Sequence, residues 1–291
     1  MHWLLLSILF SSLLMIIFVL FKKLQVNTFY AIVINYLVCV LIALFFAKDY
    51  SFSDYMTGWL PLGLVLGMFF ISLFFLIAKT TQKMGASVTT VAMKLGYVIP
   101  IFLAFTYYGE QTTPLKTIGI ILTVLAVLFT SFKKDQSSKK IDYKLMALPI
   151  IIFIGSGVAD SIVQNVSIKY FSNGGFEMFN LVIFFTAFCV GMSIALFNNI
   201  KKKQNFFTKK TILAGILLGL PNYFSIYFLF QALNVEIWED SFVFPVNNIG
   251  IVILSTVLAV IIFKEKLNRY NLIGLVLAVI SILVLNLQSI Y

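Results

Sequence analysis

Long apolar stretches, each close to the length of a membrane-crossing helix, run through the whole of this 291-residue sequence. A transmembrane helix needs about 20 consecutive, mostly apolar residues. Cutting the sequence at its polar clusters leaves ten such stretches, joined by short connections. We therefore expect transmembrane helices at Trp3–Phe21, Thr28–Ala47, Gly58–Ala78, Ala86–Tyr107, Leu115–Phe132, Leu145–Ile168, Phe176–Phe197, Thr211–Leu233, Ser241–Phe263 and Tyr270–Leu287.

The composition excludes a soluble protein. Hydrophobic residues make up 61% of the chain and charged residues only 11%, whereas soluble domains are about 25% charged. The expected fold class is an all-α integral membrane protein. We expect residues 1–21 to form the first span and not a cleavable signal peptide, because no basic region precedes this long apolar stretch.

The distribution of positive charge predicts the orientation. The net charge is +10, and the odd-numbered connections hold 17 Lys and Arg residues while the even-numbered ones hold three. Basic residues concentrate in cytoplasmic loops, so we expect the odd connections inside a bacterial plasma membrane and both termini outside. Because these charges flank apolar spans, they indicate contact with lipid headgroups and no nucleic-acid partner.

The two halves of the sequence repeat each other. Residues 103–128 and 258–283 align with a constant offset of 155 and no gap. Glu110 recurs as Glu265, and Ile118-Gly119 recurs as Ile273-Gly274. A second similarity is a pair of glycines four residues apart, a pattern that lets membrane helices approach closely. The pairs are Gly63 with Gly67 and Gly215 with Gly219.

Five spans per half is an odd number, so the second half enters the membrane upside down relative to the first. The expected organisation is a five-helix repeat over residues 1–132, a cytoplasmic linker over 133–144, and a second repeat over 145–291. Inverted repeats are typical of secondary transporters, which bind substrate near the membrane midplane between the halves.

The stretches Pro100–Gly119 and Ser255–Gly274, each with a Glu-containing turn before a glycine-bearing helix, resemble the EamA-type transporters of the drug/metabolite transporter superfamily. The resemblance covers essentially the whole chain. It implies two inverted halves around a central cavity, and often export of amino acids or other metabolites. One departure is that the proline present as Pro100 corresponds to Ser255 in the second half, where Pro245 lies nearer the helix start.

Two charged residues lie inside predicted spans. Lys94 is in the middle of the fourth span and Asp160 is in the sixth. A charge at the bilayer centre costs at least about 2.5 kcal/mol and usually marks a functional site. Lys94 is therefore a candidate docking point for an anionic substrate group, and Asp160 is either its structural ion-pair partner or a proton-binding carboxylate.

Other polar residues and helix breakers surround these two charges. Tyr97 and Gln164 share helix faces with Lys94 and Asp160, respectively. The candidate substrate-binding residues are Lys94, Tyr97, Asp160, Gln164, Asn222, Asn247 and Asn248. The candidate hinges or kinks are Pro100, Gly155, Gly157, Pro221 and Pro245, with small-residue packing or a tolerated kink as the alternative for each. We expect Glu110 and Glu265 to cap helices or organise loops and not to bind substrate.

The sequence favours a secondary transporter, an exporter of a small carboxylate such as an amino acid, with protons as a candidate coupling ion. No nucleotide-binding P-loop occurs, and no metal or cofactor is expected. An intramembrane enzyme is disfavoured because the one histidine is His2 and no hydrolase motif occurs. A membrane scaffold or receptor remains an alternative, and both monomer and homodimer remain open.

Overall fold

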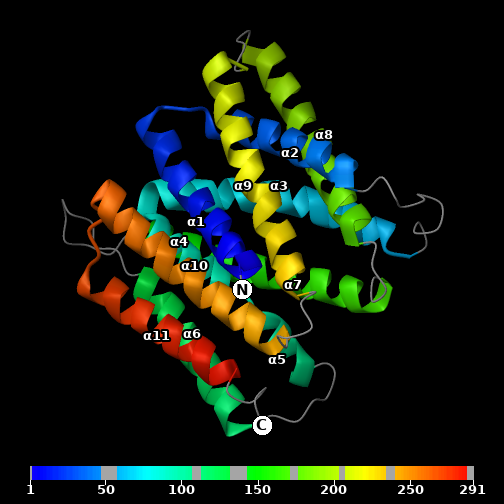
Figure 1. Cartoon of the computed structure of the whole chain (residues 1–291). Helices are drawn as coiled ribbons and strands as arrows, with labels where there is room; N and C mark the ends of the chain where they lie inside the picture. The colour runs from blue at the N-terminus through cyan, green and yellow to red at the C-terminus, as the bar shows by residue number, and fades with distance from the viewer. Residues whose placement is uncertain are drawn as a thin grey trace.

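The computed structural model consists of helices packed into one bundle (Figure 1). It describes residues 2–46, 58–106, 113–131, 143–170, 176–202, 207–233 and 240–286. The helices are α1 (His2–Lys23), α2 (Thr28–Phe46), α3 (Leu60–Met84), α4 (Ala86–Leu95), α5 (Val98–Thr106), α6 (Pro114–Ser131), α7 (Tyr143–Tyr170), α8 (Phe176–Lys202), α9 (Lys209–Leu233), α10 (Asp240–Phe263) and α11 (Arg269–Asn286). Most of the predicted linker, residues 133–142, lies outside the described ranges.

These helices follow the ten predicted segments, with one difference. The fourth segment is divided into α4 and α5. Within the described residues, nine segments are long and apolar enough to cross a membrane, with α4 and most of α5 counted as one. The apolar part of α11, Arg269–Leu285, falls short of that length. The all-helical membrane fold is therefore confirmed, while the number of ten spans stays a prediction.

Helices of the first half pack mainly against helices of the second. Helix α1 contacts α9 and α10, α2 contacts α8 and α9, and α3 contacts α7 and α8. Helix α4 contacts α7 and α10, and α6 lies along α11, as Figure 1 shows. The two halves are thus intertwined, and each half completes the core of the other.

The first glycine pair lies in a close helix–helix contact, as predicted. A Cβ atom added to Gly63 on α3 would meet the side chains of Phe179 and Val182 on α8. One added to Gly67 would lie 2.7 Å from the Ile183 carbonyl oxygen and 2.6 Å from the Thr186 Cβ. Only a residue without a side chain lets the α3 and α8 backbones approach this closely.

The second glycine pair makes the corresponding contact between α9 and α2. An added Cβ on Gly215 would lie 2.8 Å from the Ala31 carbonyl oxygen, and one on Gly219 would lie 3.0 Å from that of Asn35. Shifting α3 by 152 residues onto α9 and α2 by 148 residues onto α8 superimposes one set of contacts on the other. The predicted role of both glycine pairs is confirmed.

A third glycine contact joins α6 and α11. An added Cβ on Gly119 would lie 2.5 Å from Leu285, and one on Gly274 would lie 2.5 Å from Thr130. The offset of 155 that relates Gly119 to Gly274 also relates Thr130 to Leu285. The two contacts are therefore equivalent, with the two helices exchanged.

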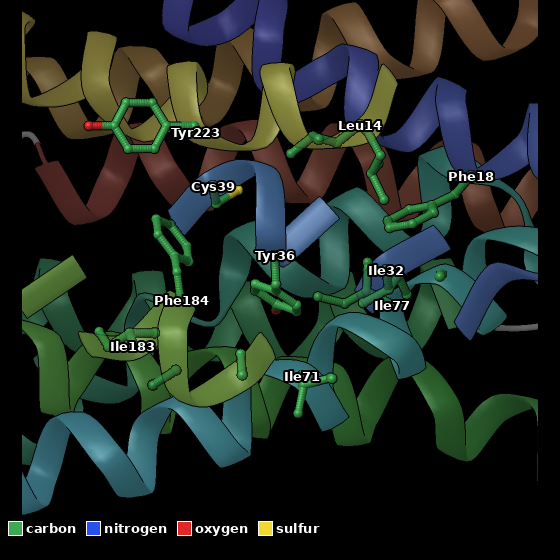
Figure 2. Close-up of a cluster of buried hydrophobic side chains, with 14 of the residues drawn as sticks. Leu14, Phe18, Ile32, Tyr36, Cys39, Ile71, Ile77, Ile183, Phe184 and Tyr223 are labelled. Carbon is green, nitrogen blue, oxygen red and sulfur yellow. The ribbon is translucent and has the colours of Figure 1, made fainter. Parts of the chain in front are cut away.

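The largest hydrophobic core lies where α1, α2, α3, α8 and α9 meet (Figure 2). Tyr36 of α2 is almost fully buried at its centre. Its ring lies 5.9 Å from that of Phe74 on α3 and 6.2 Å from that of Phe184 on α8. A smaller cluster joins α4 to α6, α10 and α11 through Val91, Leu95, Ala126, Val127, Val252, Ala278 and Ile282. Helix α4 therefore lies between the two clusters.

Several lysine-bearing helix ends meet on one side of the bundle, which we call the lysine-rich face. It comprises the chain around Lys22–Lys23, Lys83, Lys209–Lys210 and Lys264. The Lys22 ammonium donates to the Gln82 carbonyl oxygen at 2.5 Å, and the Lys210 ammonium donates to the Leu24 carbonyl oxygen. These contacts agree with the alternation of loop charges, although the cytoplasmic assignment of this face stays a prediction.

Candidate functional site

The candidate site is built on the interruption between α4 and α5. Pro100 has no backbone N–H and therefore cannot bond to the Gly96 carbonyl one turn earlier. Instead, the Ile99 N–H donates to the Gly96 carbonyl at 2.9 Å, and the Gly96 N–H donates to the Met93 carbonyl at 3.3 Å. The helix consequently ends at Leu95 and resumes at Val98. The predicted break at Pro100 thus falls just before the proline.

Helix α7 crosses this interruption at very short range. An added Cβ on Gly157 would lie 2.5 Å from the Gly96 carbonyl oxygen, and one on Gly96 would lie 2.8 Å from the Gly157 nitrogen. Two glycines face each other, so the backbones themselves are in contact. By contrast, Gly155 packs against the Leu73 and Phe69 side chains of α3. A hinge role for Gly155 and Gly157 stays a prediction.

The two intramembrane charges lie on the helices that meet here. Lys94 is half-buried in the last turn of α4, where a cation is favoured by the partial negative charge of the helix C-terminus. Asp160 lies on α7, and the charges of Lys94 and Asp160 interact electrostatically. Lys94 and Asp160 are 66 residues apart in the sequence, and the sequence analysis proposed them as partners. The electrostatic interaction between them agrees with that prediction.

Asp160 is exposed although its helix face is turned toward the interruption. It lies three and four residues after Gly157 and Ser156, both of which contact Gly96. Residues three and four apart share a helix face. The exposed apolar residues of the same helix, Ile151, Ile154 and Val158, lie on a different face. The Asp160 side chain therefore lies on a side of α7 different from the face of its exposed apolar residues.

Buried polar atoms without partners lie on the same helices and on α10. The Ser156 hydroxyl of α7 and the Asn247 amide oxygen of α10 are buried and have no hydrogen-bond partner among the described residues. Asn248 is also buried, and Tyr97 is half-buried against the smaller hydrophobic cluster. Unsatisfied buried polar groups are rare in folded proteins, so each one suggests a water or ligand partner. Ser156 was not among the residues predicted from the sequence, although its position four residues before Asp160 places it on the same helix face.

Asn222 is instead engaged in packing between helices. Its amide nitrogen donates to the Asn35 side-chain oxygen at 3.1 Å and to the Cys39 sulfur at 3.6 Å, both on α2. The Cys39 thiol donates to the Gly219 carbonyl at 3.6 Å. These bonds connect α9 to α2, next to the Gly215 and Gly219 contact. Asn35 stands out in the sequence as a lone asparagine in an apolar span, but nothing in the sequence pairs it with Asn222.

Replacing Asn222 by alanine is expected to weaken this connection between α2 and α9. Interhelical hydrogen bonds in membrane proteins average about 0.6 kcal/mol, so the loss should be a modest drop in thermal stability. A double-mutant cycle with Asn35→Ala isolates the bond. The coupling should be positive between Asn222 and Asn35, and a purely additive cycle would contradict the assignment.

The other predicted positions lie within helices. Gln164 lies in α7, Pro221 in α9 and Pro245 in α10, and these three helices continue through them. Pro149 lies inside α7 in the same way. Glu110 lies outside the described residues. A proline alone therefore does not interrupt α7, α9 or α10. The interruption before Pro100 occurs where a glycine, Gly96, lies four residues earlier.

A separate cavity of about 290 Å³ lies at the lysine-rich ends of α2 and α3. It is lined by Asn27, Thr28, Phe29, Phe75, Lys79 and Gln82. None of its lining residues comes from α4 or α7, so it is not the site around Lys94. Among the described residues, no group of three or more His, Cys, Asp or Glu side chains is placed to hold a metal ion.

The chain was compared with known protein families. The model of the EamA-like transporter family matches residues 147–287. Residues 147–287 are thus similar in sequence to the EamA-like transporter family. The resemblance seen in the sequence is thereby confirmed. The EamA-like range runs from α7 to α11 and includes Asp160, Asn247 and Glu265, while Lys94 precedes it.

Two further similarities extend over nearly the whole chain. A protein of Haemophilus influenzae, described as an uncharacterized protein, is 28% identical over 288 residues, which are 97% of this chain and 96% of that protein. A solved structure, described as "Crystal structure of protein", matches with a TM-score of 0.63 and 16% identity, covering 99% of this chain and 96% of the other. At that identity the match shows a shared fold only. The chain is thus a multi-pass membrane protein whose residues 147–287 are similar to the EamA-like family, which is a family of transporters and not of enzymes.

Proposed function

We propose that this protein is a secondary transporter that carries a small metabolite across the bacterial plasma membrane by alternating access. The observation that carries the proposal is the interrupted helix at Gly96–Tyr97, with Lys94 in the turn before it and α7, which bears Asp160, crossing it. Interrupted helices with ionisable residues at their ends are the usual way in which such transporters build a site inside the bilayer.

The interruption supplies binding groups that an intact helix would hide. A helix end leaves backbone carbonyl or N–H groups without partners, and within a membrane these are tolerated only where protein or a cavity surrounds them. The Lys94 ammonium would pair with an anionic group of the substrate. The Ser156 hydroxyl and the Asn247 amide oxygen, both unpartnered, would then bond to its polar part.

The proposed substrate class is a small carboxylate-bearing metabolite, such as an amino acid. Asp160 would bind a proton or the substrate's own cationic group, so protons are the proposed coupling ion. The proposed direction is export, because the resemblance to the EamA-type transporters implies export of metabolites. Both termini would lie outside the plasma membrane, as the loop charges predict.

Alternating access would come from rocking two inverted five-helix halves against each other. The equivalent glycine contacts support this organisation, because α3 meets α8 as α9 meets α2, and α6 and α11 meet through contacts that exchange. The packing of α1 on α9 has its counterpart in the packing of α3 on α7. Such paired contacts are what two related halves would form across a two-fold axis in the membrane plane.

A ligand screen tests the proposal directly. We expect one class among amino acids, organic acids, nucleosides and amphiphilic cations to raise the melting temperature of the detergent-purified protein. That class should then exchange across proteoliposomes containing the protein, and not across empty ones. A scaffold or receptor would be favoured if a stabilising ligand were found that never crosses the membrane.

A further inference from the structure

The loop after α10 directs a carboxylate of the second half back toward the first half. Lys264 has a left-handed backbone, with φ of 53°, and this turns the chain at the end of α10. The Glu265 N–H then donates to the Ala259 carbonyl at 3.3 Å. This turn fixes Glu265 at the lysine-rich face.

The Glu265 carboxylate caps α4. Its Oε2 accepts a hydrogen bond from the Ala86 N–H at 3.0 Å, and Ala86 is completely buried. Helix α4 has no side-chain cap of its own, because the residue before it is Gly85. A carboxylate at a helix N-terminus both satisfies a free N–H and opposes the positive end of the helix dipole. The predicted capping role of Glu265 is confirmed, and the capped helix belongs to the other half.

Gly85, the residue before α4, leaves the space that the Glu265 carboxylate occupies. Its φ of 103° is rarely adopted by residues with a side chain, and an added Cβ would lie 2.1 Å from the Glu265 Oε1. The turn between α3 and α4 therefore leaves room for this carboxylate and for nothing larger than hydrogen at position 85.

The contact joins the end of α10 to a group of first-half helices that are bonded to one another. Gln82 of α3 donates to the Phe18 carbonyl of α1 at 3.3 Å and to the Thr28 hydroxyl of α2 at 2.8 Å. Across the halves, the Lys23 ammonium lies 4.5 Å from the centre of the Phe263 ring. At this face, the Glu265 carboxylate thus links the end of α10 to α4, next to the place where α1, α2 and α3 are hydrogen-bonded to one another.

We propose that Glu265 is a latch that holds the lysine-rich face closed and that must release α4 when this face opens. The inference rests on the proposed function, because rocking of two halves is what would break the contact. Helix α4 has ten residues and so spans about 15 Å, with the latch at one end and Lys94 at the other. Release of Glu265 would therefore free the helix that carries the proposed docking residue.

Cysteine accessibility in the detergent-purified protein tests the latch. Two single-cysteine reporters are made in a background in which Cys39 and Cys189 are replaced by alanine. Ser87→Cys reports on the α4 terminus, and Ser12→Cys reports on the interior of α1, where Ser12 is fully buried. Reaction rates with a hydrophilic maleimide are compared between the parent, Glu265→Ala and Glu265→Gln, with Lys266→Gln as the control for a charge change in the same loop.

We expect Glu265→Ala to raise both labelling rates by roughly ten-fold, because a charge-assisted hydrogen bond and a charge–dipole interaction are lost together. Glu265→Gln, which keeps an acceptor but no charge, should give an intermediate rise, and Lys266→Gln should give none. A rise at Ser87→Cys alone would mean local fraying of α4 and would overturn the latch, as would unchanged rates in both Glu265 variants.

If Glu265→Ala does not fold, the isosteric Glu265→Gln decides the question by the same two rates. Labelling involves no substrate, so it is independent of the ligand screen. A rise at both reporters in a protein that carries no solute would support the latch and overturn the proposed transport. Solute flux through the protein, combined with unchanged labelling rates in the folded Glu265 variants, would support the proposed transport and overturn the latch.

Discussion

Replacing Lys94 by methionine is expected to weaken substrate binding by roughly ten- to a hundred-fold, and to lower flux and ligand-induced stabilisation with it, because a hydrogen bond to a charged group contributes about 1.5–3 kcal/mol. Methionine is similarly long and unbranched and forms helices well, so α4 should remain intact. The variant removes only the cation in the last turn of α4. Flux into proteoliposomes and the shift in melting temperature with the stabilising ligand measure the effect.

The matched control is Lys79→Met, the same substitution at an exposed lysine on α3. It should leave both readings unchanged. The double variant Lys94→Met with Asp160→Asn distinguishes the two roles of Lys94. If Lys94 binds substrate, flux stays lost in the double variant; if Lys94 is only half of a structural ion pair, neutralising both charges restores stability and flux together. The second result would contradict the proposed docking role.

Replacing Gly157 by alanine is expected to destabilise the protein by about 1–3 kcal/mol, the usual cost of overpacking a tightly packed site. The added methyl would lie 2.5 Å from the Gly96 carbonyl oxygen and 2.6 Å from the Ile99 Cβ. One of these is backbone and the other is fixed close to it, so α7 must move away from the interruption. Thermal unfolding measures the loss, and ligand binding should weaken with it because Lys94 and Asp160 are carried by the displaced helices.

Gly155→Ala provides the control on the same helix. Its added methyl would meet the Leu73 Cδ1 at 2.9 Å and Phe69 at 3.5 Å. The end of a leucine side chain can rotate away, and alanine favours helix over glycine by about 0.5–1 kcal/mol. Gly155→Ala should therefore be neutral or stabilising. Equal losses of thermal stability for the two variants would show that the contact between Gly96 and Gly157 is no less tolerant of an added methyl group than the contact of Gly155 with α3.

Features that depend on residues close in the sequence were the most predictable. The apolar runs indicated the helices because each segment must match the bilayer thickness and satisfy its own backbone hydrogen bonds. The glycine pairs indicated close contacts, and the position of Glu265 at a span end indicated a cap. In each case the physical requirement is local, even where the partner, such as α4 for Glu265, is in the other half.

Features that depend on which helix lies opposite were not predictable. The sequence places Asn222 and Asn247 alike, each in an apolar helix and near a proline. Yet the Asn222 amide is bonded to Asn35, while the Asn247 oxygen is buried without a partner. Likewise, Pro149, Pro221 and Pro245 lie inside helices, whereas Pro100 follows a helix interruption, because Gly96 supplies a flexible residue where the bond to the proline is missing. The sequence of a helix therefore indicates which of its faces is polar, but it does not indicate which other helix packs against that face.

The reciprocal contact between α6 and α11 also bears on how such a chain could have arisen. Gly119 and Thr130 are eleven residues apart, as are Gly274 and Leu285, and each glycine receives the larger side chain of the other helix. A single ancestral helix with one glycine and one larger residue at that spacing would have been complementary to its own antiparallel copy. A five-helix protein that inserted into the membrane in both orientations would thus already have had this homodimer interface before its gene was duplicated and fused. Since then the two copies would have been free to diverge everywhere except where each still fits the other, which is why Gly119 and Gly274 are expected to be among the last positions to tolerate change.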